Sequence, residues 1–391
     1  MDSRYLKLSN ENSYILLGPR QTGKTYLIRS LQASNSWMVN LLHRKTYLKY
    51  LKAPGLFRDE AEHQVKNQGV QIIYIDEIQK IPDLLDEVHA MIEEWGIRFV
   101  LTGSSARKLK RGSANLLAGR AISKRMYPLI YPEIQSDFEQ KKIELDGVLQ
   151  FGTLPGVFFK PPKSRPEILR TYVETYLKEE IQSEGLVRRL ENFANFLDVA
   201  AQSFGEVVNY SKIGKDCQQS PRTTQNYFEI LEDTLVGYLL RPWSQSQRKQ
   251  LSTHPKFYFF DNGVTCALLS RLVDPLDPPL RGRLFEQWLI NEVRARTDYD
   301  QRDVTLTFWR TQDGKEEVDL IASRGSTPLF AAEIKSFATL HADHFKSLQS
   351  FREEFPQLPL YLIYTGDQPY NKDSIQVVPW RYFLEKVVTR Y

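Results

Sequence analysis

Short apolar segments alternate with longer amphipathic ones over the first 130 residues. The segments 13–17, 37–41, 71–77 and 98–105 are rich in Ile, Leu, Val, Tyr and Phe, and stretches with helical spacing lie between them. Buried parallel strands joined by helices produce this pattern, because each strand is covered on both faces. We therefore expect a parallel sheet with flanking helices, and an α/β fold class, for residues 1–130.

The first of these segments leads into a glycine-rich loop. Residues 18–25 form a complete G-x-x-x-x-G-K-[ST] motif, and residues 26–31 continue as the start of a helix. The glycines let the backbone approach an anion closely, and the helix N-terminus faces it with N–H groups. We expect Lys24 to reach the β- and γ-phosphates of ATP and Thr25 to ligate Mg²⁺. The residues predicted to bind nucleotide here are Gly18, Pro19, Arg20, Gln21, Thr22, Gly23, Lys24 and Thr25.

Polar residues end two of the later strands. The strand at 71–77 ends in Asp76 and Glu77. We expect Asp76 to hold the Mg²⁺ and Glu77 to polarise the attacking water. The strand at 98–105 ends in a hydroxyl-rich turn, where either Thr102 or Ser104 would sense the γ-phosphate.

A run of basic residues follows that turn. No acidic residue lies between Ser104 and Arg125, whereas this stretch contains Arg107, Lys108, Lys110, Arg111, Arg120, Lys124 and Arg125. Three roles are open for the run. Arg120 is the candidate for an arginine finger that stabilises the transition state, often from a neighbouring subunit. The other two roles are contact with nucleic-acid phosphates and a solvated surface.

Several motifs together resemble a known family. The stretches GPRQTGKT, YIDEIQKIPDLL and LTGSSARKL…GSANLLAGR are similar to the AAA-type (AAA_14) ATPase domain of prokaryotic proteins that also carry a C-terminal DUF4143 region. The resemblance implies an ATPase that uses Lys24 and Thr25 for nucleotide and Mg²⁺. It implies that Asp76 binds the Mg²⁺, that Glu77 activates the water, and that Ser104 senses the γ-phosphate. Gly-Thr-Leu-Pro at 152–155 continues the likeness, so we expect the DUF4143 region to span about 150–391.

The middle of the chain is interrupted by prolines. Breaks at 127–132 and 161–166 suggest that residues 131–190 are a linker with a helical connection. Three helices and a hairpin are expected over 191–260, the order of a winged helix. Polar residues at 222–226 would then enter a DNA major groove. The segment 206–256 holds seven basic and five acidic residues, which is weak for DNA contact, so a protein-docking role stays open.

The last part of the chain carries a second set of candidate residues. Strands are expected at 305–310, 317–322 and 329–335, with a hairpin turn at Asp313-Gly314. A helix carries Glu286, and residues 261–391 resemble the restriction-endonuclease-like PD-(D/E)xK nuclease core. The residues that carry this resemblance are Glu286, Asp319, Glu333 and Lys335.

The chemistry of this second set is coherent. Strand alternation puts Glu333 and Lys335 on one face, and Asp319 lies on a neighbouring strand. Asp319 and Glu333 would hold Mg²⁺ or Mn²⁺, and Lys335 would activate water against a phosphodiester. Glu286 would complete the site and Gln349 would assist. The alternative is a folded relic that keeps this geometry without cleavage.

Composition adds limits rather than a function. The chain has 391 residues, and 52 basic against 48 acidic residues give a formal net charge of +4, too weak to argue for nucleic acid alone. Cys217 and Cys266 have no partners at metal spacing, which favours a reducing compartment. The sequence has no signal-peptide pattern and no apolar run long enough to span a bilayer, so a cytoplasmic protein without a membrane partner is expected.

Together, these features predict an Mg²⁺-dependent ATPase coupled to a nuclease-like C-terminal domain that acts on or binds DNA, with a homo-oligomer as an open possibility. The alternative is a non-cleaving ATP-driven switch that binds DNA or a protein partner.

Overall fold

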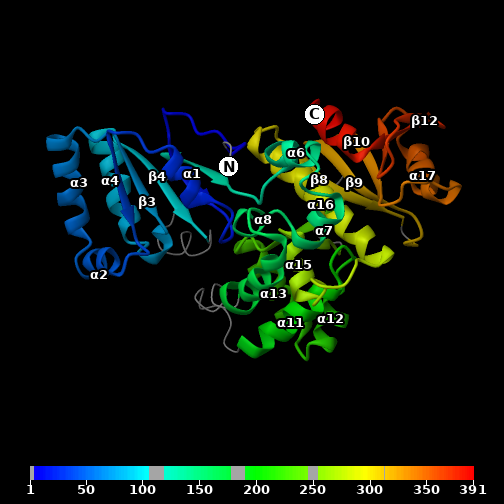
Figure 1. Cartoon of the computed structure of the whole chain (residues 1–391), viewed down its shortest axis with the longest axis horizontal. Helices are drawn as coiled ribbons and strands as arrows, with labels where there is room; N and C mark the ends of the chain where they lie inside the picture. Colours follow the sequence, from blue (N-terminus) through cyan, green and yellow to red (C-terminus); the bar gives the residue numbers. More distant parts are fainter. Residues whose placement is uncertain (1–3, 105–118, 178–189, 245–253, 312) are drawn as a thin grey trace.

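The computed structural model describes residues 4–104, 119–177, 190–244, 254–311 and 313–391. In this part of the chain the strands form a five-stranded and an eight-stranded sheet. The two sheets lie at opposite ends of the molecule, with helices between and below them (Figure 1). The predicted α/β class is confirmed.

The five-stranded sheet is parallel throughout and has the order β2-β3-β4-β1-β5. Its strands are β1 (Ser13–Leu17), β2 (Ser36–Asn40), β3 (Ile72–Asp76), β4 (Arg98–Gly103) and β5 (Ala121–Arg125). Helices α1 (Lys24–Ser30), α2 (Arg44–Lys52), α3 (Gly55–Gln68) and α4 (Leu84–Trp95) connect them. The first four strands coincide with the predicted ones. We did not predict β5, because its residues are mostly polar and partly exposed, as an edge strand permits.

The segment predicted as a linker is a packed helical body. It contains α6 (Tyr131–Glu139), α7 (Leu145–Phe151), α8 (Pro155–Phe158), α9 (Arg165–Thr171) and a π-helical turn over Tyr172–Leu177. Their apolar side chains, such as Leu149, Leu154 and Leu169, are fully buried in the largest core of the molecule. The described part of this segment therefore consists of short helices that pack into this core.

The elements predicted for a winged helix occur in the expected order. They are α11 (Leu190–Gln202), α12 (Tyr210–Asp216), α13 (Pro221–Asp233), β6 (Gly237–Pro242) and β7 (Lys256–Phe259). The Ser220 side chain accepts a hydrogen bond from the Thr223 N–H at 3.1 Å and caps α13. However, β6 also pairs with β8, so the hairpin belongs to the eight-stranded sheet and is not a free wing. The predicted domain boundary at residue 260 would therefore separate β6 and β7 from the other strands of that sheet.

The eight-stranded sheet is mixed and has the order β12-β13-β11-β10-β9-β8-β6-β7. Its remaining strands are β8 (Thr305–Arg310), β9 (Glu317–Arg324), β10 (Thr327–Lys335), β11 (Leu360–Tyr364), β12 (Tyr370–Lys372) and β13 (Ile375–Pro379). Helices α15 (Asn262–Leu268), α16 (Pro278–Tyr299), α17 (Lys346–Glu354) and α18 (Trp380–Tyr382) accompany them. Strands β8, β9 and β10 contain the three that we predicted.

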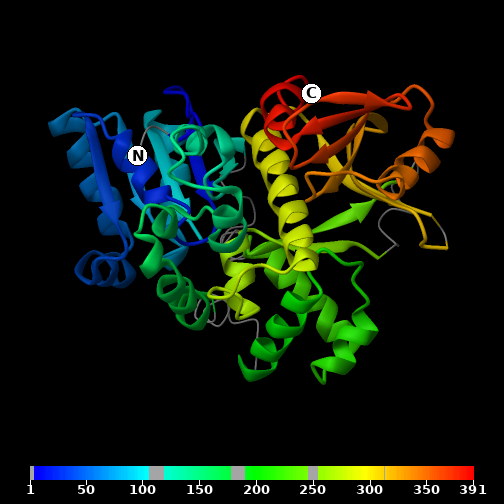
Figure 2. The same cartoon turned by 45° about the vertical axis from the view of Figure 1, so that its right-hand side comes forward.

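Helix α16 lies between the two sheets (Figure 2). Leu284 and Ile290 are buried in the core of the C-terminal unit. Ala295 and Tyr299, near the other end of the helix, are buried with Tyr14 and Leu16 of β1. The helix therefore joins the two halves of the molecule. Among the described helices, none combines the length and apolar character that crossing a bilayer requires.

Candidate nucleotide site and C-terminal charge cluster

The glycine-rich loop connects β1 to α1 and closes on its own lysine. The Lys24 ammonium donates hydrogen bonds to the carbonyl oxygens of Gly18 at 2.6 Å and Pro19 at 2.9 Å. Gly23 has φ +92°, which favours glycine, and a Cβ at Gly18 would lie 2.4 Å from the carbonyl oxygen of Met126. The loop therefore wraps closely around the ammonium of its own lysine.

Thr25 and Asp76 meet beside this loop. The Thr25 Oγ1 lies 3.1 and 3.0 Å from the two carboxylate oxygens of Asp76, at the carboxyl end of β3. A hydroxyl and a carboxylate are hard oxygen ligands, so this pair fits Mg²⁺ bound with a nucleotide. Thr102 donates to Asp76 Oδ1 at 2.6 Å and accepts from the Glu77 N–H at 3.0 Å. Of the two hydroxyls predicted as sensors, that of Thr102 therefore holds the Asp76 carboxylate and the Glu77 backbone in place.

Glu77 is held by a residue that we did not predict. The Gln79 amide donates to Glu77 Oε2 at 2.5 Å and to Ser104 Oγ at 2.9 Å, and all three residues are buried. Glu77 has φ +64°, a left-handed conformation that is uncommon outside glycine and is associated with functional sites. Gln79 thus links the predicted catalytic carboxylate to the remaining sensor candidate, Ser104.

Arg4 is a second residue that we did not predict. Its guanidinium is buried and donates to the Thr22 carbonyl oxygen inside the loop. The same group donates to Glu133 Oε1 at 2.7 Å on α6 and to the Tyr299 hydroxyl at 3.4 Å on α16. It also donates to the Tyr127 carbonyl oxygen at 2.9 Å. One side chain therefore connects the loop to both helices.

The structure does not bring Arg120 to the loop of its own chain. Arg120 precedes β5, whose first residue pairs with Ser13 at the start of β1, whereas the loop follows Leu17. The first and last Cα atoms of a five-residue strand are about 13 Å apart. Arg120 Nε donates instead to Glu93 Oε1 on α4 at 2.8 Å. The other basic residues predicted between Arg107 and Arg111 lie outside the described residues.

The four residues predicted for a nuclease site are brought together in the C-terminal unit. Glu286 comes from α16, Asp319 from β9, and Glu333 and Lys335 from β10. The Lys335 ammonium donates to Glu333 Oε1 at 2.5 Å, and Asp319 Oδ2 accepts from the Ile334 N–H at 2.8 Å. Gln349 donates to Asp373 at 3.4 Å instead.

Burial changes the acidity of two of these carboxyls. Burial, with the nearby charge of Asp319, raises the pKa of Glu333 to about 8 against the opposing effect of Lys335. Burial likewise raises the pKa of Glu286 to about 7, although the charge of Lys256 opposes it. Both groups therefore titrate near neutral pH rather than as ordinary glutamates.

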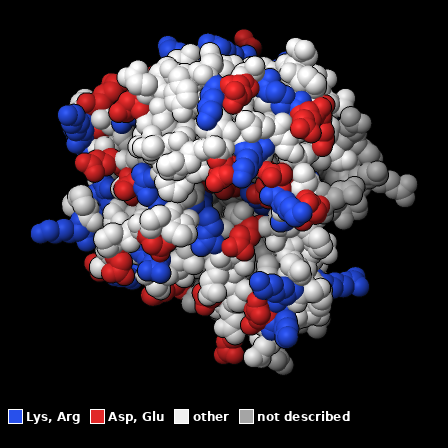
Figure 3. Space-filling model, turned by 90° about the vertical axis from the view of Figure 1, so that its right-hand side faces the viewer, with Lys and Arg blue, Asp and Glu red and all other residues white. Residues whose placement is uncertain are grey.

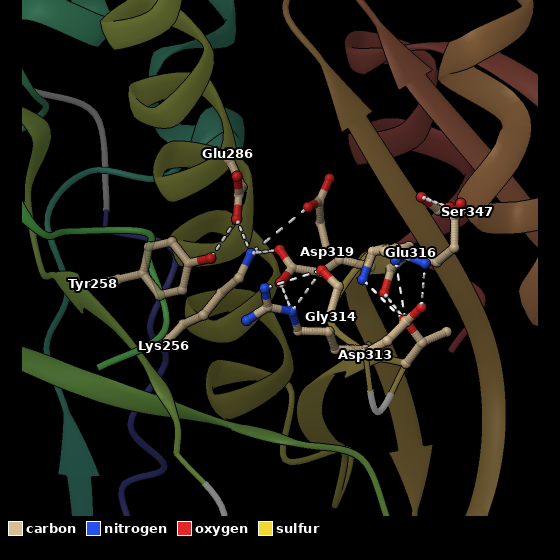
Figure 4. Close-up of polar contacts among 12 residues, drawn as sticks. Lys256, Tyr258, Glu286, Asp313, Gly314, Glu316, Asp319 and Ser347 are labelled. Atoms are coloured by element: carbon tan, nitrogen blue, oxygen red, sulfur yellow. Dashed lines mark hydrogen bonds and ion pairs between the residues drawn. The ribbon is translucent and has the colours of Figure 1, made fainter. Parts of the chain in front are cut away.

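A further lysine, which we did not predict, lies among these carboxylates (Figure 4). The Lys256 ammonium is 3.0 Å from Glu286 Oε1, 2.5 Å from Glu317 Oε1 and 3.8 Å from Asp319 Oδ1. Tyr258 donates to the same Glu286 oxygen. We refer to Lys256, Glu286, Glu317, Asp319, Glu333 and Lys335 as the charge cluster.

The donor atoms of the charge cluster do not form a ready metal site. In the described ranges, no three His, Cys, Asp or Glu side chains are grouped so that they could hold one metal ion. Asp319, one of the two predicted ligands, already faces an ammonium and a backbone N–H. Outside the cluster, basic and acidic side chains are interspersed on this face of the molecule (Figure 3).

Comparison with known families divides the chain into three matched segments. Residues 10–135 match a model described as AAA domain. Residues 143–273 match a domain of unknown function (DUF8612), and residues 281–383 match another (DUF4143). The chain thus carries an AAA domain at its N-terminus and a DUF4143 region at its C-terminus, and the AAA match supports an ATPase-type function. The DUF4143 match is shorter than the span of about 150–391 that we expected.

Similar proteins occur in distant organisms and are described only as uncharacterized. One from Mycobacterium tuberculosis is 24% identical over 372 residues, covering 93% of this chain and 79% of its own length. Others from Haemophilus influenzae and Methanocaldococcus jannaschii are each 23% identical, covering 64% and 74% of this chain and 67% and 68% of their own. Domain III of the Thermotoga maritima replication initiation protein DnaA aligns at TM-score 0.27 and 16% identity, over 43% of this chain and 78% of that one.

Proposed function

We propose that this chain hydrolyses ATP with Mg²⁺ at the loop between β1 and α1. The observation that carries the proposal is the meeting of Thr25 and Asp76, with two contacts of 3.1 and 3.0 Å, directly beside the loop. When bound, Mg²⁺ would neutralise charge on the phosphates. Lys24 would bind the β- and γ-phosphates, while Thr25 and Asp76 would hold the ion.

Glu77 is the proposed base in this reaction. Its carboxylate would orient a water molecule and accept its proton as the water oxygen bonds to the γ-phosphorus, while the bond from that phosphorus to the bridging oxygen breaks and ADP leaves. Gln79 holds that carboxylate next to Ser104, which would sense the γ-phosphate. A homo-oligomer in which Arg120 reaches the site of a neighbour is compatible with the position of Arg120 on the surface.

The nucleotide cycle would act on the C-terminal unit through Arg4 and α16. Arg4 contacts the loop at Thr22 and α16 at Tyr299. Tyr131, at the start of α6, donates its N–H to Glu292 of α16 at 2.8 Å. A shift of the loop on nucleotide binding would therefore change contacts that hold α16, which also carries Glu286.

Two outputs of this cycle are candidates. Phosphodiester cleavage with Mg²⁺ or Mn²⁺ is favoured by the convergence of Glu286, Asp319, Glu333 and Lys335. A non-cleaving switch that binds DNA or a protein partner is favoured by the contacts of Lys256. Its ammonium pairs with carboxylates that a metal ion would need as ligands. The exposed start of α13, at Arg222, would be the DNA-contacting part in either case.

An ATPase assay tests the proposal. Lys24→Ala should abolish Mg²⁺-dependent phosphate release, and the exposed Lys163→Ala serves as the matched control, with turnover like that of the wild type. Equal turnover in Lys24→Ala and wild type would reject the assigned site. Incubation of the wild type with DNA and RNA, with and without ATP and Mn²⁺, separates the two outputs. Cleavage that Asp319→Ala removes would establish the first.

A further inference from the structure

Lys256 provides three N–H donors, and three carboxylates surround them. The ammonium is within hydrogen-bond distance of Glu286 at 3.0 Å and Glu317 at 2.5 Å, and it forms a longer ion pair with Asp319 at 3.8 Å. The positive charge of this buried ammonium therefore faces three carboxylates.

The position of Lys256 is fixed by its surroundings. Only 3% of its side chain is exposed, and its ammonium lies 5.5 Å from the centre of the Phe308 ring. Its backbone pairs with Leu240 of β6. The side chain of Lys256 is therefore buried among the carboxylates and beside the Phe308 ring.

Lys335 occupies a different position. Its side chain is 26% exposed and pairs with Glu333 at 2.5 Å. It lies at the rim of the charge cluster, whereas Lys256 lies inside it (Figure 4 shows the carboxylates around Lys256). The two lysines are therefore not equivalent.

We propose that Lys256 is the resident cation of the charge cluster and takes the place that a divalent metal ion has in a PD-(D/E)xK site. A metal ion there would compete for Asp319 and Glu286 and would lie next to a buried positive charge. The wild-type cluster consequently binds no Mg²⁺ or Mn²⁺. The inference rests on the proposed function and deepens it. Of the two candidate outputs of the nucleotide cycle, it assigns the non-cleaving switch.

Titration with Mn²⁺, followed by the loss of the electron paramagnetic resonance signal of the free ion, tests this inference. The nucleotide-free protein with Asp76→Asn is used, so that the site beside the loop contributes nothing. With Lys256 present we expect no bound Mn²⁺ up to about 1 mM. Lys256→Met should bind one Mn²⁺ at least about tenfold more tightly, and added Asp319→Asn should remove it. Lys335→Met is the matched control and should gain nothing.

Two results would overturn the inference. One is Mn²⁺ binding by the protein that keeps Lys256, if Asp319→Asn abolishes it. The other is a folded Lys256→Met protein, judged by circular dichroism and thermal midpoint, that binds no Mn²⁺. If Lys256→Met does not fold, the double variant Lys256→Met with Glu317→Gln replaces it. This variant removes one charge of each sign, and its Mn²⁺ binding is measured in the same way. ATP hydrolysis is also measured in Lys256→Met with Asp76 intact. Hydrolysis by this protein would show that the proposed ATPase function holds even if the inference about Lys256 fails.

Discussion

The nucleotide site and the charge cluster both contain carboxylates and at least one lysine, but the partners of those carboxylates differ. In the described structure, Asp76 and Glu77 receive hydrogen bonds from Thr25, Thr102 and Gln79, which are neutral hydroxyl and amide groups. In the cluster, Asp319 and Glu333 face the ammonium groups of Lys256 and Lys335.

The difference teaches how to distinguish a cation site from a charge-balanced core. Neutral partners orient a carboxylate and leave its negative charge for an incoming cation. Ammonium partners cancel the charge, and their removal leaves an uncompensated buried ion. Counting acidic residues in a motif does not separate these cases, whereas the charge of their hydrogen-bond partners does.

The largest expected effect comes from exchanging one aspartate in each region. Asp76→Asn should lower ATP turnover at least about 100-fold with a nearly unchanged thermal midpoint, because it removes a ligand of the proposed ion. Asp319→Asn should lower the free energy of unfolding by about 3 kcal/mol while turnover per folded molecule stays within about twofold. Phosphate release measures ATP turnover, and urea unfolding measures the free energy of unfolding. A stable Asp319→Asn protein would contradict the comparison.

A second prediction concerns the proposed base. Glu77→Gln keeps the size and hydrogen bonds of the side chain but not its charge. We expect turnover to fall about 100-fold while ATP affinity, measured by fluorescence titration, remains near that of the wild type. Loss of affinity equal to the loss of turnover would assign Glu77 to binding instead. Glu286→Gln, in the other region, should leave turnover unchanged.

Arg4 connects the two regions and tests their coupling. Arg4→Met should cost about 3 kcal/mol of unfolding free energy, because Glu133 and the Thr22 carbonyl oxygen lose a buried charged partner. It should also raise the KM for ATP through the loop. Arg4→Lys keeps the charge and should recover part of the stability. Unfolding and ATPase measurements on the same preparations provide the check, and an unchanged KM would remove Arg4 from the coupling path.

A smaller effect is expected where an amide or a hydroxyl orients a carboxylate. Gln79→Leu should slow ATP turnover by about tenfold, because Glu77 loses its partner. Tyr258→Phe removes the hydroxyl that donates to Glu286 and should cost about 1 kcal/mol of stability without slowing turnover. If ATP turnover fell in Tyr258→Phe but not in Gln79→Leu, the charge cluster and not the nucleotide site would be the region on which hydrolysis depends.

The last prediction concerns a pH dependence of stability. Burial, with the charge of Glu133, raises the pKa of Glu292 from 4.5 to about 8, although its hydrogen bond from Tyr131 and the charge of Arg296 oppose this. Between these values the folded chain keeps a proton that the unfolded chain releases, so stability is lost as pH rises through this window. The slope from this group is at most about 1.4 kcal/mol per pH unit. Urea unfolding at several pH values should show a shallower slope in Glu292→Gln, and an identical slope would refute this origin.

The sequence predicted the parts of the molecule that depend on local pattern. Strands β1, β3 and β4 are apolar runs. Strand β1 leads into the glycine-rich loop, β3 ends at Asp76, and β4 ends at Thr102-Gly103. Parallel strands bring these ends to one edge of the sheet. Strand β5 escaped notice because an exposed edge needs no apolar pattern.

Gln79, Arg4 and Lys256 escaped notice for a different reason. Their roles depend on contacts made across the fold, such as that between Lys256 and Glu317. Gln79 had the most local signal, as a polar residue two positions after Glu77 in a buried segment. Arg4 and Lys256 resemble ordinary surface residues in the sequence, and only the packing around them shows that they are buried.

Helix α16 has a consequence for the spacing of residues along the chain. Glu286 and Tyr299 are 13 residues apart on one continuous helix, which corresponds to about 20 Å of rigid rod. One residue inserted between them would rotate one end by about 100° relative to the other. Either Glu286 would leave Lys256 or Tyr299 would leave Arg4. The helical phase of α16 therefore restricts insertions and deletions between these positions, even though the nucleotide site and the charge cluster share no side chain.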